Sequence, residues 1–231
     1  MIRLLALCGL LGLVPLGFLP LQGADPLPAV LARMDRAARP FRCMTANIQE
    51  TVYTQVVDDK ALSSGTIKLR RAKPGDIRFL VDFTNPDAPR SVAFAGTEIR
   101  IYKPKENVEQ IIDVATHKAT IEQYMLLGFG ATAADITAAY DVAYVGPATV
   151  EGQQAAELKL VPKSKEVQAK LTQAELWISD TLGVPVQQKF LYPGGNYTLF
   201  TYSNLKLVPT LGDKDLQLKP AKDVHISKVG A

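Results

Sequence analysis

The chain has 231 residues, of which 47% are apolar and 21% charged, a balance typical of a globular protein and too apolar for a disordered one. Its 26 basic and 23 acidic residues leave a formal charge of only +3, spread along the chain without a block of like charges. Nucleic acid is therefore not expected as a partner, because binding a phosphate backbone requires a concentrated basic surface. The composition also excludes a fibre, a disulfide-rich miniprotein and a membrane protein with several spans.

Residues 1–24 have the order of features found in a secretory signal peptide. A basic start with Arg3 precedes an uncharged, leucine-rich stretch and then small residues. A retained transmembrane helix is the alternative, because the stretch approaches the ~20 residues that span a bilayer. Pro15 and Pro20 interrupt it and no basic cluster follows, so we predict a cleaved signal peptide and a single domain over 25–231.

Apolar residues at intervals of three and four predict one amphipathic helix, which Pro26 begins and Pro40 ends. After this helix the apolar period changes to two, which is typical of an antiparallel sheet with one buried face. We expect strands at 44–48, 67–69, 77–83, 92–94, 99–101, around Ile111, and at 142–144, 158–160, 176–178, 190–192, 199–201, 205–207 and 216–218. Turns are expected at Lys103–Lys105, Gly146–Pro147, Glu151–Gly152, Asp180–Gly183 and Pro193–Asn196. In the strand at 77–83, Leu80 breaks the alternation.

The stretch from Thr120 to Tyr140 interrupts the strand pattern. Its first part returns to helical spacing with a wide apolar surface, and Ala133–Tyr140 is alanine-rich, which favours a second short helix. The sequence Met125-Leu126-Leu127-Gly128-Phe129 places apolar residues around a glycine and suits a movable lid.

No arrangement of residues indicates catalysis. The two histidines lie far apart without metal-ligand spacing to cysteine or carboxylates, so no metal site is expected, and no nucleophile turn or phosphate-binding loop follows a strand. Removal of the signal peptide takes Cys8 away and leaves Cys43 alone in an apolar context, where a small buried side chain is favoured over a nucleophile. A secreted hydrolase stays open as an alternative, since triads are assembled in space. We expect no enzyme and no cofactor.

A curved sheet covered by short helices could enclose an apolar hollow that holds a lipid, although the same residues could simply fill a core. Several motifs, in order and spacing, bear on this choice. They are Met44-x-Ala46-x-Ile48-x-Glu50, Gly65–Leu69, Lys73–Phe79, the hairpin Ala95–Pro104, Leu126–Gly128, Tyr140–Val142 and Leu216-x-Leu218-x-Pro220 with Val224-x-Ile226. Together they resemble the periplasmic outer-membrane lipoprotein carrier family, the LolA-like proteins.

The resemblance implies a mainly β fold, an incomplete and strongly curved antiparallel barrel of about eleven strands that short α-helices cover around a hydrophobic cavity. The implied acyl-chain cavity residues are Ile77, Phe79, Val81, Phe94, Ile99 and Ile101, and the implied lid residues are Met125, Leu126 and Phe129. Ile77, Phe79 and Val81 alternate along one strand, so they share a face.

The departures from the family concern the lid and one hairpin. Where the better-known members carry an arginine that closes the lid, this chain has Lys73, which cannot reproduce the guanidinium fork. The resemblance implies Lys73 and Arg71 as the lid-closing polar contacts, with lid closure either weaker than in the family or organised by Arg70 or Arg71 instead. Ala95 replaces the turn aspartate of the family hairpin and Arg100 replaces its tryptophan.

The implied function is that of a periplasmic carrier, a monomer that takes lipoprotein acyl chains or lipid from an inner-membrane ABC-type exporter to an outer-membrane acceptor. A lipid- or lipoprotein-sensing module on the same fold is the main alternative, because fold alone does not define cargo.

Overall fold

The computed structural model describes residues 26–73, 76–118 and 127–229. The predicted signal peptide and the predicted lid residues Met125 and Leu126 lie outside the described residues.

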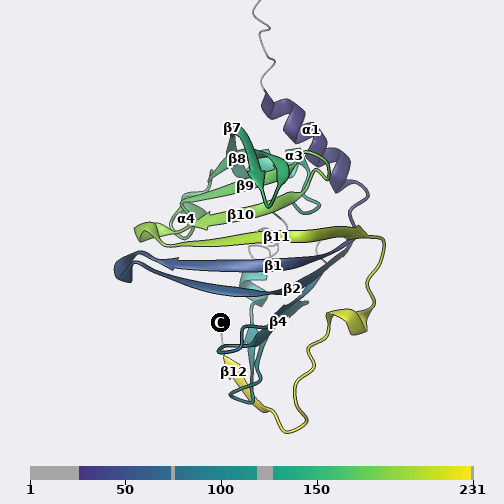
Figure 1. Ribbon diagram of the computed structural model, residues 1–231, viewed down its shortest axis with the longest axis vertical. Coiled ribbons are helices and arrows are strands. Elements are labelled where there is room, and N and C mark those ends of the chain that lie inside the picture. The colour runs from purple at the N-terminus through teal and green to yellow at the C-terminus, as the bar shows by residue number, and fades with distance from the viewer. Residues whose placement is uncertain (1–25, 74–75, 119–126, 230–231) are drawn as a thin grey trace, which may run out of the picture.

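Twelve strands form a single sheet in the described part of the chain, in the order β12-β6-β5-β4-β3-β2-β1-β11-β10-β9-β8-β7 (Figure 1). All neighbours are antiparallel except β12 and β6, which are parallel. The expected mainly β fold, an incomplete and strongly curved barrel, is confirmed as an open, curled sheet. It has twelve described strands where about eleven were expected. The strands are β1 (Cys43–Thr54), β2 (Asp59–Lys73), β3 (Asp76–Phe83), β4 (Arg90–Ala95), β5 (Glu98–Lys103), β6 (Val108–Asp113), β7 (Tyr140–Val150), β8 (Gln153–Pro162), β9 (Gln173–Ser179), β10 (Pro185–Leu191), β11 (Tyr197–Val208) and β12 (His225–Val229).

The described helices are short. They are α1 (Pro26–Ala38), α3 (Ala133–Ala139), α4 (Lys165–Gln168) and the 3-10 turns η1 (Gln55–Val57), η2 (Ala115–His117), η3 (Pro193–Gly195) and η4 (Asp213–Leu216). Thr132 caps α3 through a capping box with Asp135, whose pKa these hydrogen bonds from Thr132 lower. The predicted helices after Pro26 and at Ala133 are confirmed.

Two apolar clusters divide the inner face of the sheet. One joins α1 and α3 to strands β8, β9 and β10, with Val30 and Met34 of α1 buried there. The other covers strands β1 to β4 and includes Phe41, Phe79 and Phe94. Phe200 on β11 packs against both clusters, and so does α1, whose Ala37 lies against the second cluster.

The segment after β11 runs outside the sheet to β12 (Figure 1). The strand expected at 216–218 is wrong, because Leu216 ends η4 and is buried against Leu80 and Ala93 on the outer face. This contact explains why Leu80 breaks the alternation of β3, since that side chain is buried on the face opposite Phe79.

The turn expected at Gly146–Pro147 is also wrong, since both residues lie within β7. The register against β8 shifts between Tyr144 and Gly146, which marks a bulge. β7 is the last strand of the sheet, and an edge strand tolerates a proline because one of its sides has no ladder to donate to.

Within the described residues, no helix is long and apolar enough to cross a bilayer.

Candidate functional site

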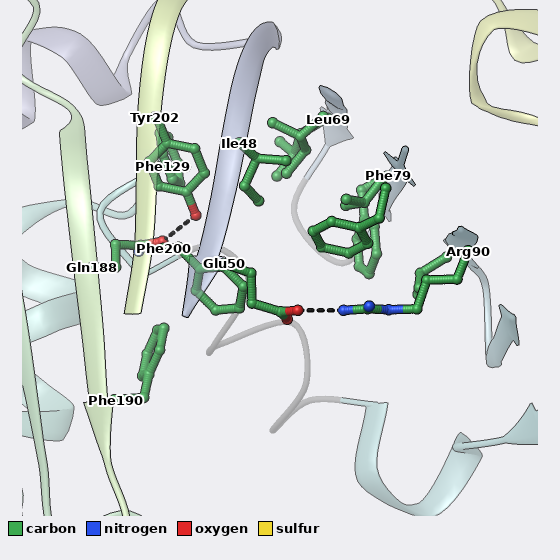
Figure 2. Close-up of a pocket in the computed structure, with 14 residues that line it drawn as sticks. Ile48, Glu50, Leu69, Phe79, Arg90, Phe129, Gln188, Phe190, Phe200 and Tyr202 are labelled. Carbon is green, nitrogen blue, oxygen red and sulfur yellow. Dashed lines mark hydrogen bonds and ion pairs between the residues drawn. The ribbon is translucent and has the colours of Figure 1, made fainter. Parts of the chain in front are cut away.

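A cavity of about 200 Å³ lies on the inner face of the sheet, where strands β1 to β4 curl toward β10 and β11 (Figure 2). On each of these strands, the side chains that line this cavity belong to every second residue. The alternating apolar pattern of the sequence therefore supplies the residues of the cavity wall. The lining residues are Ile48, Glu50, Ile67, Leu69, Phe79, Val81, Phe83, Arg90, Val92, Phe129, Gln188, Phe190, Phe200 and Tyr202.

Two of the predicted cavity residues, Phe79 and Val81, line this cavity. Phe79 stands opposite Leu69 on one side and opposite Phe94 on the other, and its ring stacks on that of Phe94 with 5.7 Å between centroids. Ile77 is 1% exposed and belongs to the same apolar cluster, without lining the cavity.

The other predicted cavity residues form the wall behind the cavity. Phe94 pairs with Ile99, and Val92, which lines the cavity, pairs with Ile101, so all lie on the same face of the sheet. Ile99 packs against the apolar cluster, and Ile101 is half-buried.

The predicted lid residue Phe129 closes one end of the cavity. Its ring meets that of Tyr202 edge-on at 5.3 Å and that of Phe41 at 6.3 Å. It belongs to a turn, Leu127–Gly130, that reaches both apolar clusters, because Leu127 lies in the cluster that α1 and α3 cover while Phe129 lies in the other.

Polar groups from both sides of the cavity hold this turn. Gln188 Nε2 donates to the Leu127 carbonyl oxygen at 2.5 Å, and Gln188 Oε1 accepts from the Tyr202 hydroxyl at 2.7 Å. Burial, and to a lesser degree the charge of Glu50, raises the pKa of Tyr202, so its hydroxyl stays protonated and can donate.

From the opposite side, Arg71 Nη1 donates to the carbonyl oxygen of Gly130. Of the residues predicted to hold a lid, Arg71 thus contacts the turn that carries Phe129. Lys73 is exposed at the end of β2, and Arg70 lies on the outer face, where its Nη2 is 2.5 Å from Asp213 Oδ1.

Glu50 on β1 and Arg90 on β4 face each other across the open end of the cavity and form an ion pair (Figure 2). Arg90 Nη1 also donates to Ser63 Oγ at 3.1 Å, and its guanidinium lies 4.1 Å from the centre of the Phe83 ring. The Glu50 and Arg90 side chains are 14% and 28% exposed, respectively.

A second hollow of about 440 Å³ continues from this point and shares Glu50, Phe190 and Phe200 with the cavity. Leu171, Tyr192 and Lys170 extend its wall. The two spaces thus share the side chains of Glu50, Phe190 and Phe200.

No group of three or more His, Cys, Asp or Glu side chains in the described part of the chain could hold a metal ion. Cys43 is buried and free, as expected from its apolar context.

Sequence reasoning missed most of the lining residues on the other strands. Ile48 and Glu50 belong to the alternating set that begins at Met44, so the same parity rule that selected Phe79 could have found them. Phe190, Phe200 and Tyr202 could not be found in this way, because only the curl of the sheet brings β10 and β11 opposite β3.

The architecture defines an open, curled antiparallel sheet with helices and a buried turn on its inner face. Solved structures with this fold include MucB, which has a TM-score of 0.53 and 16% identity over 88% of this chain and 66% of that one. This chain therefore spans slightly less than two thirds of MucB. An uncharacterized conserved protein from Thermus thermophilus matches with a TM-score of 0.54 and 14% identity over 89% of this chain and 100% of that one.

A LolA superfamily protein from Nitrosomonas europaea also matches, with a TM-score of 0.40 and 15% identity over 83% of this chain and 97% of that one. No family model matches the sequence, and no curated protein matches it either. The curved, open antiparallel sheet expected from the sequence motifs is confirmed, since the chain shares its fold with MucB and with the Thermus thermophilus protein, and at these identities the likeness concerns the fold alone.

Proposed function

We propose that this protein is a periplasmic carrier that binds the acyl chains of lipoproteins in its inner-face cavity and moves them from the inner to the outer membrane. The observation that carries the proposal is the cavity itself, whose 14 lining residues are apolar or aromatic except for Glu50, Arg90 and Gln188. Gln188 is engaged with the turn, so the wall is apolar except at its open end.

The energetics of such a site suit a carrier. Each methylene that leaves water contributes about 0.8 kcal/mol, so affinity grows with chain length without specific polar chemistry. The cavity of about 200 Å³ is smaller than the ~300–1,000 Å³ of a typical ligand pocket. We infer that an acyl chain enters by displacing the turn that carries Phe129.

The first test is binding of a fluorescent fatty-acid probe and its displacement by alcohols of increasing chain length. We expect affinity to rise about tenfold for every two methylenes, until the space is filled. Phe79→Glu should abolish binding, because it places a carboxylate in the apolar wall.

A second variant tests the cavity in case Phe79→Glu does not fold. Val92→Trp adds bulk at a half-buried lining position and should weaken binding while leaving the circular dichroism spectrum unchanged. Leu207→Trp is its matched control, since Leu207 is 40% exposed on β11 and lies outside the cavity wall. Equal binding by both variants and the wild type would contradict the proposed cavity.

A sensing module is the second candidate, supported by the likeness to MucB, which has been crystallised in complex with MucA(peri). Native mass spectrometry of the protein from its own cell envelope separates the two. Near-stoichiometric acylated peptide or lipid supports a carrier, and a stable partner protein without bound lipid supports a sensor. The inner-membrane exporter and outer-membrane acceptor, proposed from the resemblance, are tested by crosslinking in the same cells.

A further inference from the structure

The Glu50–Arg90 pair is the charged feature of an otherwise apolar cavity. Among the described residues that line the cavity, these two are the only charged ones. They come from strands that are not neighbours, since β2 and β3 lie between β1 and β4. The pair therefore spans the curl of the sheet across the inner face.

The pair lies at the open end of the cavity. Ile48, Leu69 and Phe79 deeper in the wall are buried, whereas Glu50 and Arg90 are half-buried. Past Glu50, β1 continues to the exposed end of a hairpin, where η1 connects it to β2. A chain bound against the apolar wall would therefore leave its polar end beside these two side chains.

Within the described residues, the contacts of these two side chains leave donors and acceptors unused. Arg90 has five N–H donors, of which the ion pair and Ser63 Oγ account for two. Only Oε2 of Glu50 meets the guanidinium, which leaves Oε1 as a further acceptor. The pair can thus accept from a ligand hydroxyl or amide N–H and donate to a ligand carbonyl while it remains intact.

We propose that Glu50 and Arg90 form a headgroup subsite that selects amphiphiles whose acyl chain ends in a neutral ester, amide or hydroxyl group. The proposal rests on the proposed function. An anionic head that accepts from the free N–H groups of Arg90 would lie beside the Glu50 carboxylate, and a cationic head that donates to Glu50 Oε1 would lie beside the Arg90 guanidinium. Either arrangement brings like charges together in a largely buried site, which is costly, whereas a neutral polar head bonds to both groups without such repulsion.

The test uses three amphiphiles with the same hexadecyl-length chain: monopalmitoylglycerol, hexadecyl sulfate and hexadecylamine, which is protonated at neutral pH. Each displaces a neutral fluorescent acyl probe below its micellar concentration. We expect the wild type to bind the glycerol ester about tenfold more tightly than either charged amphiphile, the factor that corresponds to about one charge-assisted hydrogen bond.

Two single variants should shift this preference in opposite directions. Glu50→Gln should favour the sulfate and Arg90→Gln the amine, each by about tenfold relative to the glycerol ester. The double variant Glu50→Gln/Arg90→Gln should remove the discrimination and regain thermal stability lost by either single variant, since no unpaired charge remains.

The outcomes separate this proposal from the carrier function. If the wild type binds none of the three amphiphiles, the proposed function itself fails. If it binds all three and the two variants keep the wild-type order of preference, the subsite is overturned while the cavity stands. An ion pair that only stabilises the curl of the sheet would change the melting temperature without changing that order.

Discussion

The position of Cys43 at the start of β1 determines the burial and the pKa of its thiol. The thiol is 2% exposed and belongs to no disulfide within the described residues. Burial raises its pKa, and this effect outweighs the opposing influence of a backbone hydrogen bond at Leu211 and of the charge on Arg70.

We therefore predict that Cys43 is inert in the folded protein. A colourimetric thiol reagent at neutral pH should label it at most very slowly in buffer and completely in guanidinium chloride, because the reactive species is the thiolate. Fast labelling of the native protein would contradict the burial of this residue.

At the same scale, the sequence predicts the faces of strands well. Alternation placed Phe79 and Val81 together, and both line the cavity. Alternation could not show that Ile77, which shares their face, lies outside the cavity wall, since contact with the cavity depends on how the sheet curls.

The turn Leu127–Gly130 contributes Phe129 to the cavity wall. Gly130 has a φ of +76°, in the left-handed region, and a Cβ there would lie 2.8 Å from Arg71 Nη1 and 2.9 Å from Phe41 Cδ1. Local conformation and close packing therefore both require glycine at this position.

Replacement of Gly130 tests how firmly the turn is held. Gly130→Ala should lower the free energy of unfolding by about 1–3 kcal/mol, since it adds the strain of a left-handed alanine to a steric contact. Gly96→Ala is the matched control, because Gly96 has a φ of +66° with nothing within 4 Å of its added Cβ. In urea unfolding, the control should lose about 1 kcal/mol at most. Equal losses for both variants would mean that the contact with Arg71 and Phe41 contributes nothing.

For elements, sequence periodicity identified α1, α3 and most strands. It failed at β7, where it read Gly146–Pro147 as a turn, because tolerance of a proline depends on whether the strand lies at the edge of a sheet. It failed again at 216–218, where spacing typical of a strand belongs to a segment that packs apolar residues against the outer face.

At the scale of the whole molecule, the segment after β11 packs on the outer face and forms ion pairs with strands β2 and β3. Arg70 and Arg78 both approach Asp213, with Arg70 also donating to the carbonyl of Leu211 at 2.8 Å. The hydrogen bond from Arg70, together with the charges of both arginines, lowers the pKa of Asp213.

This pKa shift predicts the pH at which the segment loosens. A lowered folded-state pKa means that the stabilisation is present above the ordinary aspartate pKa of about 3.9 and is lost as the pH falls through the lower folded value. Near neutral pH, Asp213→Asn should therefore speed amide hydrogen exchange at 211–218 relative to the wild type. The difference should shrink once the pH falls below the folded-state pKa.

Comparing the two proteins at equal pH removes the intrinsic pH dependence of exchange. Asp223→Asn, in the same segment, is the control and should leave exchange at 211–218 unchanged, since the arginines that hold η4 meet Asp213 instead. Equal exchange by Asp213→Asn and the wild type at neutral pH would contradict a role for these ion pairs in docking the segment.

By itself the sequence determined the class of fold, the helix after Pro26, the alternating strands and the apolar face from which the cavity is built. These follow from local periods, because a period of two or 3.6 fixes which side chains share a face. The tertiary structure alone decided that β10 and β11 complete the cavity wall, that Glu50 meets Arg90 across two intervening strands, and that Leu216 covers the outer face. Such contacts join residues far apart in the chain, and the curl of a twelve-stranded sheet, which no local pattern encodes, brings them together.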